Sequence, residues 1–341
     1  MKFLVKIAFT LPFILLCACA QLDQEDNASK AIDDITQADS PPNLSVSSAP
    51  KYDERVMSAG NLSGLHIDAG AGTPVVLIVP GSGPTDLNGN NPQGVQANTY
   101  KLLAEGLAAE NISSVRVDKR GMFSSAAAGD GNAVSLEIYA QDYKNWVETI
   151  RAETGQSCVY MLGHSEGALM VSAASIDNEN VCGLILVSGM GRTYGDVIRS
   201  QLKANPNNPD RILNQGFRAI EQLERGERVD LDKLHSGFAP LFAPEIQDFL
   251  MSVMSVDPAQ LAAKANKKTM VIHGVNDLQT STLDAQKLAD ATGGHLVMIE
   301  GINHVLKEAP LNRQKNYATY KKPDLPISDS VITAIRIFVL G

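Results

Sequence analysis

Residues 158–174 read Cys-Val-Tyr-Met-Leu-Gly-His-Ser-Glu-Gly-Ala-Leu-Met-Val-Ser-Ala-Ala. The run 158–162 has the length and residue types of a buried strand, and 168–174 is apolar enough for a buried helix. Between them stands G-x-S-x-G, a pattern typical of a tight strand-to-helix turn that raises a serine above a sheet. Glycines two residues before and after the serine leave room for that turn. We therefore expect Ser165 to be a nucleophile at the carboxyl end of a strand.

Outward from this segment, short apolar runs alternate with helix-like stretches. Strands are expected at 75–79, 114–117, 184–187, 269–272 and 295–299, and helices at 100–109, 136–153, 282–291 and 328–340. This alternation favours an α/β protein with a mostly parallel sheet and helices on both faces. Between about 190 and 266 the alternation stops, and prolines break a series of helix-like pieces. We interpret this stretch as a helical cap inserted into one domain that spans 51–341.

A serine nucleophile needs a base, and the base needs a carboxylate that holds its tautomer. In folds that use this turn, the acid and the histidine follow the serine in that order, each beyond a strand. Asp277 lies in the loop after the strand expected at 269–272, and His304 lies in the loop after 295–299. A helix-capping role for Asp277 and a surface position for His304 are the alternatives, but they do not explain the joint order. We predict the catalytic residues Ser165, Asp277 and His304.

The tetrahedral intermediate of acyl transfer needs two backbone N–H donors. One is expected from Glu166, the residue after the nucleophile, and the other from the loop Pro80-Gly81-Ser82-Gly83 after an early strand. We predict an oxyanion hole formed by the N–H groups of Ser82 and Glu166, with Gly83 as the alternative to Ser82. The same loop lacks the G-x-x-x-x-G-K-[ST] pattern and the third glycine of a dinucleotide site, so no nucleotide cofactor is expected.

The N-terminus has the features of an export signal. Lys2 and Lys6 precede an apolar run from 7 to 16 and small residues, so we predict a signal peptide at 1–18. Leu16-Cys17-Ala18-Cys19 resembles a bacterial lipobox that would lipidate Cys19, whereas Ala18-Cys19-Ala20 fits ordinary cleavage. Residues 19–50 contain prolines, several acids and no aromatic residue, which indicates a flexible tether. We expect an exported protein, periplasmic or anchored to the bacterial envelope by lipid.

The composition argues against a nucleic-acid partner and against a metal site. The formal net charge is −9 and no basic stripe is visible, so a nucleic-acid partner is not expected. The four cysteines and six histidines show no metal-ligand spacing, and no metal is expected. Within the predicted domain, Cys158 and Cys182 lie near the starts of two expected neighbouring strands. A disulfide in an oxidising compartment and two buried free thiols remain equally open interpretations.

With these pieces in place, the chain resembles the α/β-hydrolase family, in particular bacterial secreted or lipid-anchored carboxylesterases. The resemblance covers roughly residue 62 to the C-terminus and rests most on the segments 80–86, 118–121, 163–167, 188–192 and 301–304. It implies an α/β-hydrolase fold with an eight-stranded, mostly parallel sheet, ester hydrolysis without a cofactor, and a triad on Ser165, Asp277 and His304. The cluster Asp118-Lys119-Arg120 is interpreted as an ion-pairing scaffold.

These observations predict a serine hydrolase that cleaves a small-molecule carboxylic ester through an acyl-enzyme on Ser165. The Phe, Leu and Met residues of the cap are expected to form a substrate pocket, unless they only fill the interior of the cap. A peptidase, a lactonase or a thioesterase with the same triad is an alternative, because fold does not fix substrate. A non-catalytic surface lipoprotein that kept the fold for binding is the alternative of another class. The oligomeric state and the natural substrate are not predicted.

Overall fold

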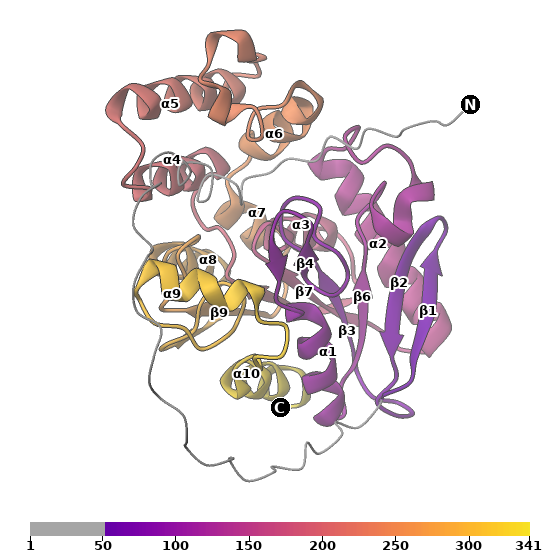
Figure 1. Cartoon of the computed structure of the whole chain (residues 1–341). Coiled ribbons are helices and arrows are strands. Elements are labelled where there is room, and N and C mark those ends of the chain that lie inside the picture. Colours follow the sequence, from indigo (N-terminus) through magenta and orange to yellow (C-terminus); the bar gives the residue numbers. More distant parts are fainter. Residues whose placement is uncertain (1–51) are drawn as a thin grey trace, which may run out of the picture.

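The computed structural model describes residues 52–341. The predicted signal peptide (1–18), the tether (19–50) and the lipidation site Cys19 lie outside the described residues. Figure 1 shows a central twisted sheet with helices on both of its faces and a group of helices above one end of it.

One eight-stranded sheet runs through the molecule in the order β1-β2-β6-β3-β7-β8-β9-β10. Its strands are β1 (Glu54–Ala59), β2 (Leu62–Ile67), β3 (Val75–Val79), β6 (Ser113–Val117), β7 (Val159–His164), β8 (Val181–Val187), β9 (Thr269–Gly274) and β10 (His295–Ile299). β1 and β2 pair antiparallel with each other, β2 is antiparallel to β6, and the other neighbours are parallel. Parallel strands end at the same edge of a sheet, so the loops after β3, β7, β9 and β10 share one edge.

Side chains of the strands alternate between two apolar layers. Along β3, Val76 and Ile78 pack with α1 (Thr99–Ala109) and α10 (Asp329–Leu340). Val75, Leu77 and Val79 face the opposite side. That side is covered by α2 (Leu136–Thr154), α3 (Glu166–Ser175) and α8 (Thr282–Thr292). Burial on both faces explains why the central strands are almost continuously apolar in sequence.

The stretch between β8 and β9 is helical. It contains α4 (Tyr194–Ala204), α5 (Asp210–Glu224), η3 (Leu231–Lys233), η4 (Ser236–Phe238), η5 (Pro244–Ile246), α6 (Gln247–Met254) and α7 (Pro258–Lys264). In Figure 1, α4, α5 and α6 lie together above the sheet, whereas α7 lies close to α3 and α8. This is the stretch for which the sequence predicts a cap.

Short elements complete the loops at the same edge. A two-stranded hairpin of β4 (Asn90–Asn91) and β5 (Val95–Gln96) follows β3. The 3-10 helix η2 (Phe123–Ala128) follows β6, and α9 (Arg313–Ala318) with η6 (Thr319–Lys321) follows β10.

The two domain cysteines form a disulfide. Cys158 directly precedes β7 and Cys182 lies near the start of β8, with a Cα–Cα distance of 5.2 Å. Of the two interpretations left open by the sequence, the structure therefore contains the disulfide. Among residues 52–341, no helix combines the length and the apolar composition that crossing a bilayer requires.

Candidate active site

Ser165 occupies a strained turn between β7 and α3. Its backbone angles are φ 57° and ψ −121°, in a region that residues other than glycine seldom adopt and that costs about 1–3 kcal/mol. The Ser165 N–H donates to the Val187 carbonyl at 2.9 Å, which ties the turn to β8. The side chain is thereby presented at the carboxyl edge of the sheet.

Glycines make this turn geometrically feasible. A Cβ on Gly163 would lie 2.3 Å from the Gly167 carbonyl oxygen, and a Cβ on Gly167 would lie 2.5 Å from the Val79 carbonyl oxygen. Neither contact is sterically allowed. The loop after β3 approaches the nucleophile closely at Gly81. A Cβ added to this glycine would lie only 3.1 Å from the Cβ of Ser165. The glycines of the motif therefore allow neighbouring backbone segments to pack directly against each other.

Asp277 and His304 meet at the same edge. His304 Nδ1 lies 2.7 Å from Asp277 Oδ2, and both side chains are buried. The same carboxylate also accepts the backbone N–H groups of Gln279 at 2.7 Å and Thr280 at 3.1 Å. Burial alone would raise the pKa of Asp277, but the charge and hydrogen bond of His304 outweigh it and hold the pKa well below its usual value. In the neutral form of the ring, the ionised carboxylate makes Nδ1 the protonated nitrogen, which leaves Nε2 as the acceptor.

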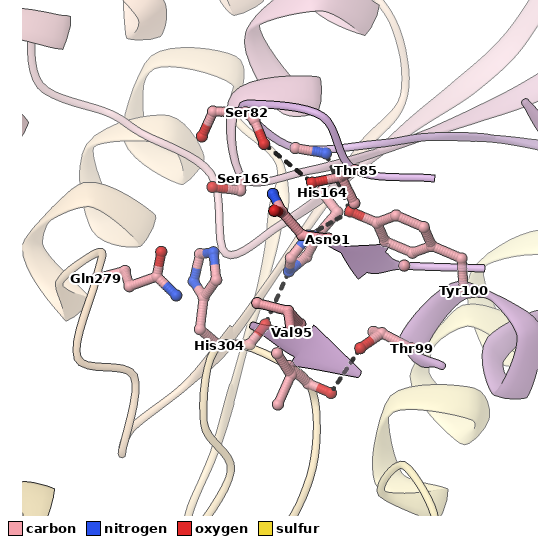
Figure 2. Close-up of a pocket in the computed structure, with 13 residues that line it drawn as sticks. Ser82, Thr85, Asn91, Val95, Thr99, Tyr100, His164, Ser165, Gln279 and His304 are labelled. Atoms are coloured by element: carbon pink, nitrogen blue, oxygen red, sulfur yellow. Dashed lines mark hydrogen bonds between the residues drawn. The ribbon is translucent and has the colours of Figure 1, made fainter. Parts of the chain in front are cut away.

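Ser165 and His304 line one cavity. It has a volume of about 410 Å³ and also contains Ser82, Asn91 and His164 in its wall. Figure 2 shows the His304 ring and the Ser165 side chain around the same space. The hydrogen bonds of the described residues include none from Ser165 Oγ. Catalytic hydrogen bonds are often long without a ligand and shorten in the substrate complex.

Of the two predicted oxyanion donors, Ser82 lines this cavity and Glu166 directly follows the nucleophile. Glu166 is the first residue of α3, where backbone N–H groups have no partner within the helix. Among the hydrogen bonds of residues 52–341, none is donated by the N–H of Ser82 or Glu166. The preceding N–H, that of Gly81, is already used, because it donates to the Tyr100 hydroxyl at 3.0 Å. The Gly83 N–H also lacks a partner there, but Ser82 and not Gly83 lines the cavity with Ser165.

His164, the residue before Ser165, links the surrounding loops. Its Nε2 lies 2.8 Å from the His304 carbonyl oxygen, so Nε2 donates and the tautomer is set. Nδ1 then accepts from the Tyr100 hydroxyl at 2.9 Å. Burial, with a further contribution from His304, lowers the pKa of His164 to about 3, so the ring stays neutral. The sequence correctly excludes His164 as the base but gives no sign of this linking contact.

Glu166, the residue after Ser165, carries a buried carboxylate. One oxygen lies 3.7 Å from Lys119 Nζ, and the other accepts from the Tyr194 hydroxyl of α4 at 2.8 Å. Lys119 also donates to the Gly81 carbonyl at 2.9 Å, and its burial lowers its pKa against the opposing effect of Glu166. Arg120 pairs with Asp142, so Lys119 and Arg120 form ion pairs as the sequence indicates. Asp118 differs: it accepts the backbone N–H groups of Leu87 and Ser124 and has no ion pair among the described residues. The partners themselves were not predicted.

A second cavity of about 430 Å³ lies between Ser165 and the helix α4. Its wall includes Met190, Tyr194, Val197 and Ile198. The aromatic and aliphatic cluster expected to form this pocket lies elsewhere: Phe238, Leu241, Phe242 and Leu250 are fully buried in the core of the helical stretch. For these four residues the second of the two predicted alternatives holds, because they fill the interior of the helical stretch and pack α4, α5 and α6 together. Within the described part of the chain, no three His, Cys, Asp or Glu side chains are grouped to hold a metal ion.

Comparison with known proteins gives the fold. The family model described as serine aminopeptidase, S33, matches residues 94–222, a stretch that contains Ser165 but neither Asp277 nor His304. Among solved structures, the esterase Pf2001 of Pyrococcus furiosus superposes with a TM-score of 0.52 at 14% identity, covering 85% of this chain and 90% of that one. Est1E from Butyrivibrio proteoclasticus gives 0.51 at 13% identity, covering 84% and 99%.

The 2-hydroxy-6-oxo-6-phenylhexa-2,4-dienoate hydrolase of Rhodococcus sp. strain RHA1 gives a TM-score of 0.50 at 15% identity, over 85% and 99% of the two chains. The chain has the α/β-hydrolase fold. The prediction of this fold, with a mostly parallel eight-stranded sheet, is confirmed. No curated protein matched the sequence.

Proposed function

We propose that this α/β-hydrolase-fold protein is a serine hydrolase that cleaves carboxylic esters through an acyl-enzyme on Ser165. The observation that carries the proposal is the arrangement around one cavity. Ser165 stands on its strained turn, and His304 lies in the same wall with its Nδ1 held at 2.7 Å by a buried carboxylate. This is the geometry of a nucleophile, a base and the group that orients the base.

The proposed reaction has two halves. His304 Nε2 removes the proton of Ser165 Oγ, which attacks the ester carbonyl. The N–H groups of Ser82 and Glu166 donate to the oxyanion, and the protonated Nε2 gives its proton to the leaving alcohol as the C–O bond breaks. Water then attacks the acyl-enzyme by the same steps and releases the acid. Asp277 remains ionised throughout and stabilises the imidazolium.

An aminopeptidase with the same triad is the alternative suggested by the matched family description. A free N-terminal ammonium is usually bound by a carboxylate. Neither cavity beside Ser165 has an Asp or Glu side chain in its wall. This favours an uncharged substrate such as an ester over a peptide with a free amino terminus.

We also propose that the protein is exported to the periplasm or the envelope surface. The Cys158–Cys182 disulfide supports an oxidising compartment. Labelling cells with a membrane-impermeant reagent before and after outer-membrane permeabilisation would locate the protein. Lipidation at Cys19 predicts a mass gain that Cys19→Ala abolishes, whereas ordinary cleavage predicts none.

The proposed reaction is tested by hydrolysis of p-nitrophenyl acetate and butyrate by the purified protein and its Ser165→Ala variant. We expect the variant to lose about 10³-fold or more in kcat/KM. Hydrolysis by the parent should also fall in acid, because a protonated histidine cannot take the proton of Ser165. Equal turnover by both proteins would contradict the nucleophile. Turnover of alanine p-nitroanilide but of neither ester would favour the peptidase.

A further inference from the structure

A buried amide in the wall of the Ser165 cavity has an unpaired donor. The side chain of Asn91, in the β4–β5 hairpin, is 4% exposed, and within residues 52–341 its Nδ2 has no hydrogen-bond partner. An amide N–H₂ that is buried without an acceptor destabilises the structure that holds it. Figure 2 shows the Asn91 amide pointing into the cavity toward Ser165.

The orientation of this amide is fixed by its other end. Asn91 Oδ1 accepts the backbone N–H of Gln93 at 2.8 Å, so the oxygen must face the hairpin and the nitrogen must face the cavity. Neighbouring hydroxyls in the same wall are already used. The Thr85 hydroxyl donates to the Ser82 carbonyl, and the Tyr100 hydroxyl donates to His164. The cavity therefore offers a positioned donor at Asn91 that no acceptor in the described part of the chain satisfies.

The position of His304 indicates which half of a substrate meets this donor. The leaving oxygen must come within hydrogen-bond reach of the histidine that protonates it. His304 lines the cavity that contains Asn91 and does not line the cavity beneath α4. On this ground the leaving group is assigned to the Asn91 cavity. The acyl chain is assigned to the cavity beneath α4, where Met190, Val197 and Ile198 lie beside the polar Gln201 and Thr280.

We propose that Asn91 is a specificity-determining residue whose Nδ2 donates a hydrogen bond to an acceptor oxygen in the leaving group of the substrate. This inference rests on the proposed ester hydrolysis and narrows its substrate class. The preferred substrates are esters of oxygenated alcohols, such as glycol, glycerol or sugar esters. A plain alkyl alcohol in the same place leaves the donor unsatisfied, and sites with buried polar groups discriminate strongly against substrates that do so.

The test uses two acetates of nearly equal shape, 2-methoxyethyl acetate and butyl acetate, with hydrolysis followed by pH-stat. The ether oxygen can only accept a hydrogen bond. After division by the alkaline hydrolysis rate of each ester, we expect the parent to prefer the methoxyethyl ester by about 10-fold in kcat/KM. Asn91→Asp retains the acceptor for the Gln93 N–H but replaces the donor by an acceptor, and should abolish this preference.

Two controls make the result specific. Gln96→Glu places the same charge change on an exposed residue of the same hairpin and should leave the ratio as in the parent. In a second pair, p-nitrophenyl methoxyacetate and p-nitrophenyl butyrate, the ether oxygen lies in the acyl half, so Asn91→Asp should not change that ratio. If Asn91→Asp does not fold by circular dichroism, Asn91→Ser provides a shorter side chain for the same comparison.

The outcomes separate the inference from the function on which it rests. A parent ratio near one, or a preference that survives Asn91→Asp, overturns the role of Asn91 while ester hydrolysis stands. A change confined to the acyl pair overturns the assignment to the leaving group. If Asn91 substitution slows all four esters equally, Asn91 is an oxyanion donor and the inference is wrong. A parent that hydrolyses none of them contradicts the proposed function itself.

Discussion

The two residues that flank Ser165 hold the site in different ways. His164 forms a neutral, directional series in which Gly81 N–H donates to Tyr100, Tyr100 donates to His164, and His164 donates to the His304 carbonyl. Glu166 forms a charged cluster with Lys119, to which Tyr194 adds a hydrogen bond from α4. One side uses fixed hydrogen-bond polarity, and the other uses opposite charges.

The contacts of His164 and those of Glu166 both hold the backbone of Gly81. The N–H of Gly81 is held through Tyr100 on the His164 side, and the carbonyl of Gly81 is held by Lys119 on the Glu166 side. Ser82, the proposed oxyanion donor, follows directly. His164 and Glu166, the two variable positions of G-x-S-x-G, therefore fix the loop that faces the nucleophile. Neither side chain needs to contact the substrate for this.

Substitutions on the Glu166 side should lower the free energy of unfolding more than substitutions on the His164 side. Lys119→Met leaves the Glu166 carboxylate buried without its counter-charge, and removing one member of such a pair costs about 3–5 kcal/mol. We expect that loss in the free energy of unfolding, measured by urea denaturation at pH 7. The double variant Lys119→Met/Glu166→Gln should recover part of the loss, because it removes the unpaired charge. A loss below 1 kcal/mol in the single variant would show that water reaches the pair.

Substitutions on the His164 side should lower the free energy of unfolding less. Tyr100→Phe removes the hydroxyl between Gly81 and His164 and leaves two polar groups unpaired, for a loss of about 1–3 kcal/mol in unfolding free energy. Because Gly81 positions the oxyanion loop, we expect kcat to fall more than KM rises. Tyr160→Phe is the matched control, since its hydroxyl bonds only the Val339 carbonyl at 3.3 Å. Equal effects of both substitutions on kcat would contradict the role of Tyr100.

The third effect depends on pH and concerns the His164 side. His164 has a pKa lowered to about 3 in the folded chain, against an ordinary value near 6.5 when unfolded. Between these values the unfolded chain binds the extra proton, so stability is lost as the pH falls below about 6.5, by about 1.4 kcal/mol per pH unit. His66 and His273, whose pKa values burial also lowers, add in the same direction.

The measurement is urea unfolding of the parent and of His164→Gln from pH 7 to pH 5. Gln cannot be protonated, so the slope of unfolding free energy against pH should be smaller in the variant, whatever its absolute stability. Identical slopes would mean that His164 is protonated equally in both states, which is incompatible with its neutral role.

The sequence predicts the parallel core well because those strands are buried on both faces. It does not reveal β1 and β2, which lie at the edge, where the exposed residues of β1 interrupt any apolar run. The pairs of residues in β4 and β5 are too short for any periodicity, so the hairpin that carries Asn91 was not predicted. The sequence leaves the role of the cap aromatics open, because apolar clustering does not distinguish an interior from a pocket.

For the site, chain order and strand ends bring Ser165, Asp277 and His304 to one edge, and this follows from topology alone. The contacts of Glu166 do not follow, because they depend on how Lys119 after β6 and Tyr194 on α4 are oriented toward α3. The free amide of Asn91 is likewise visible only once every neighbouring donor and acceptor has been assigned.

The series that joins Gly81, Tyr100, His164 and the His304 carbonyl has a consequence for biosynthesis. Its members are spread over more than 200 positions of the chain, and the last of them lies beyond the final strand of the sheet. Contacts between such distant residues form late, after the long intervening segments have been ordered. The site therefore cannot be complete until the segment that carries His304 has packed against the sheet. A chain truncated before that segment would contain Ser165 and Asp277 but no base.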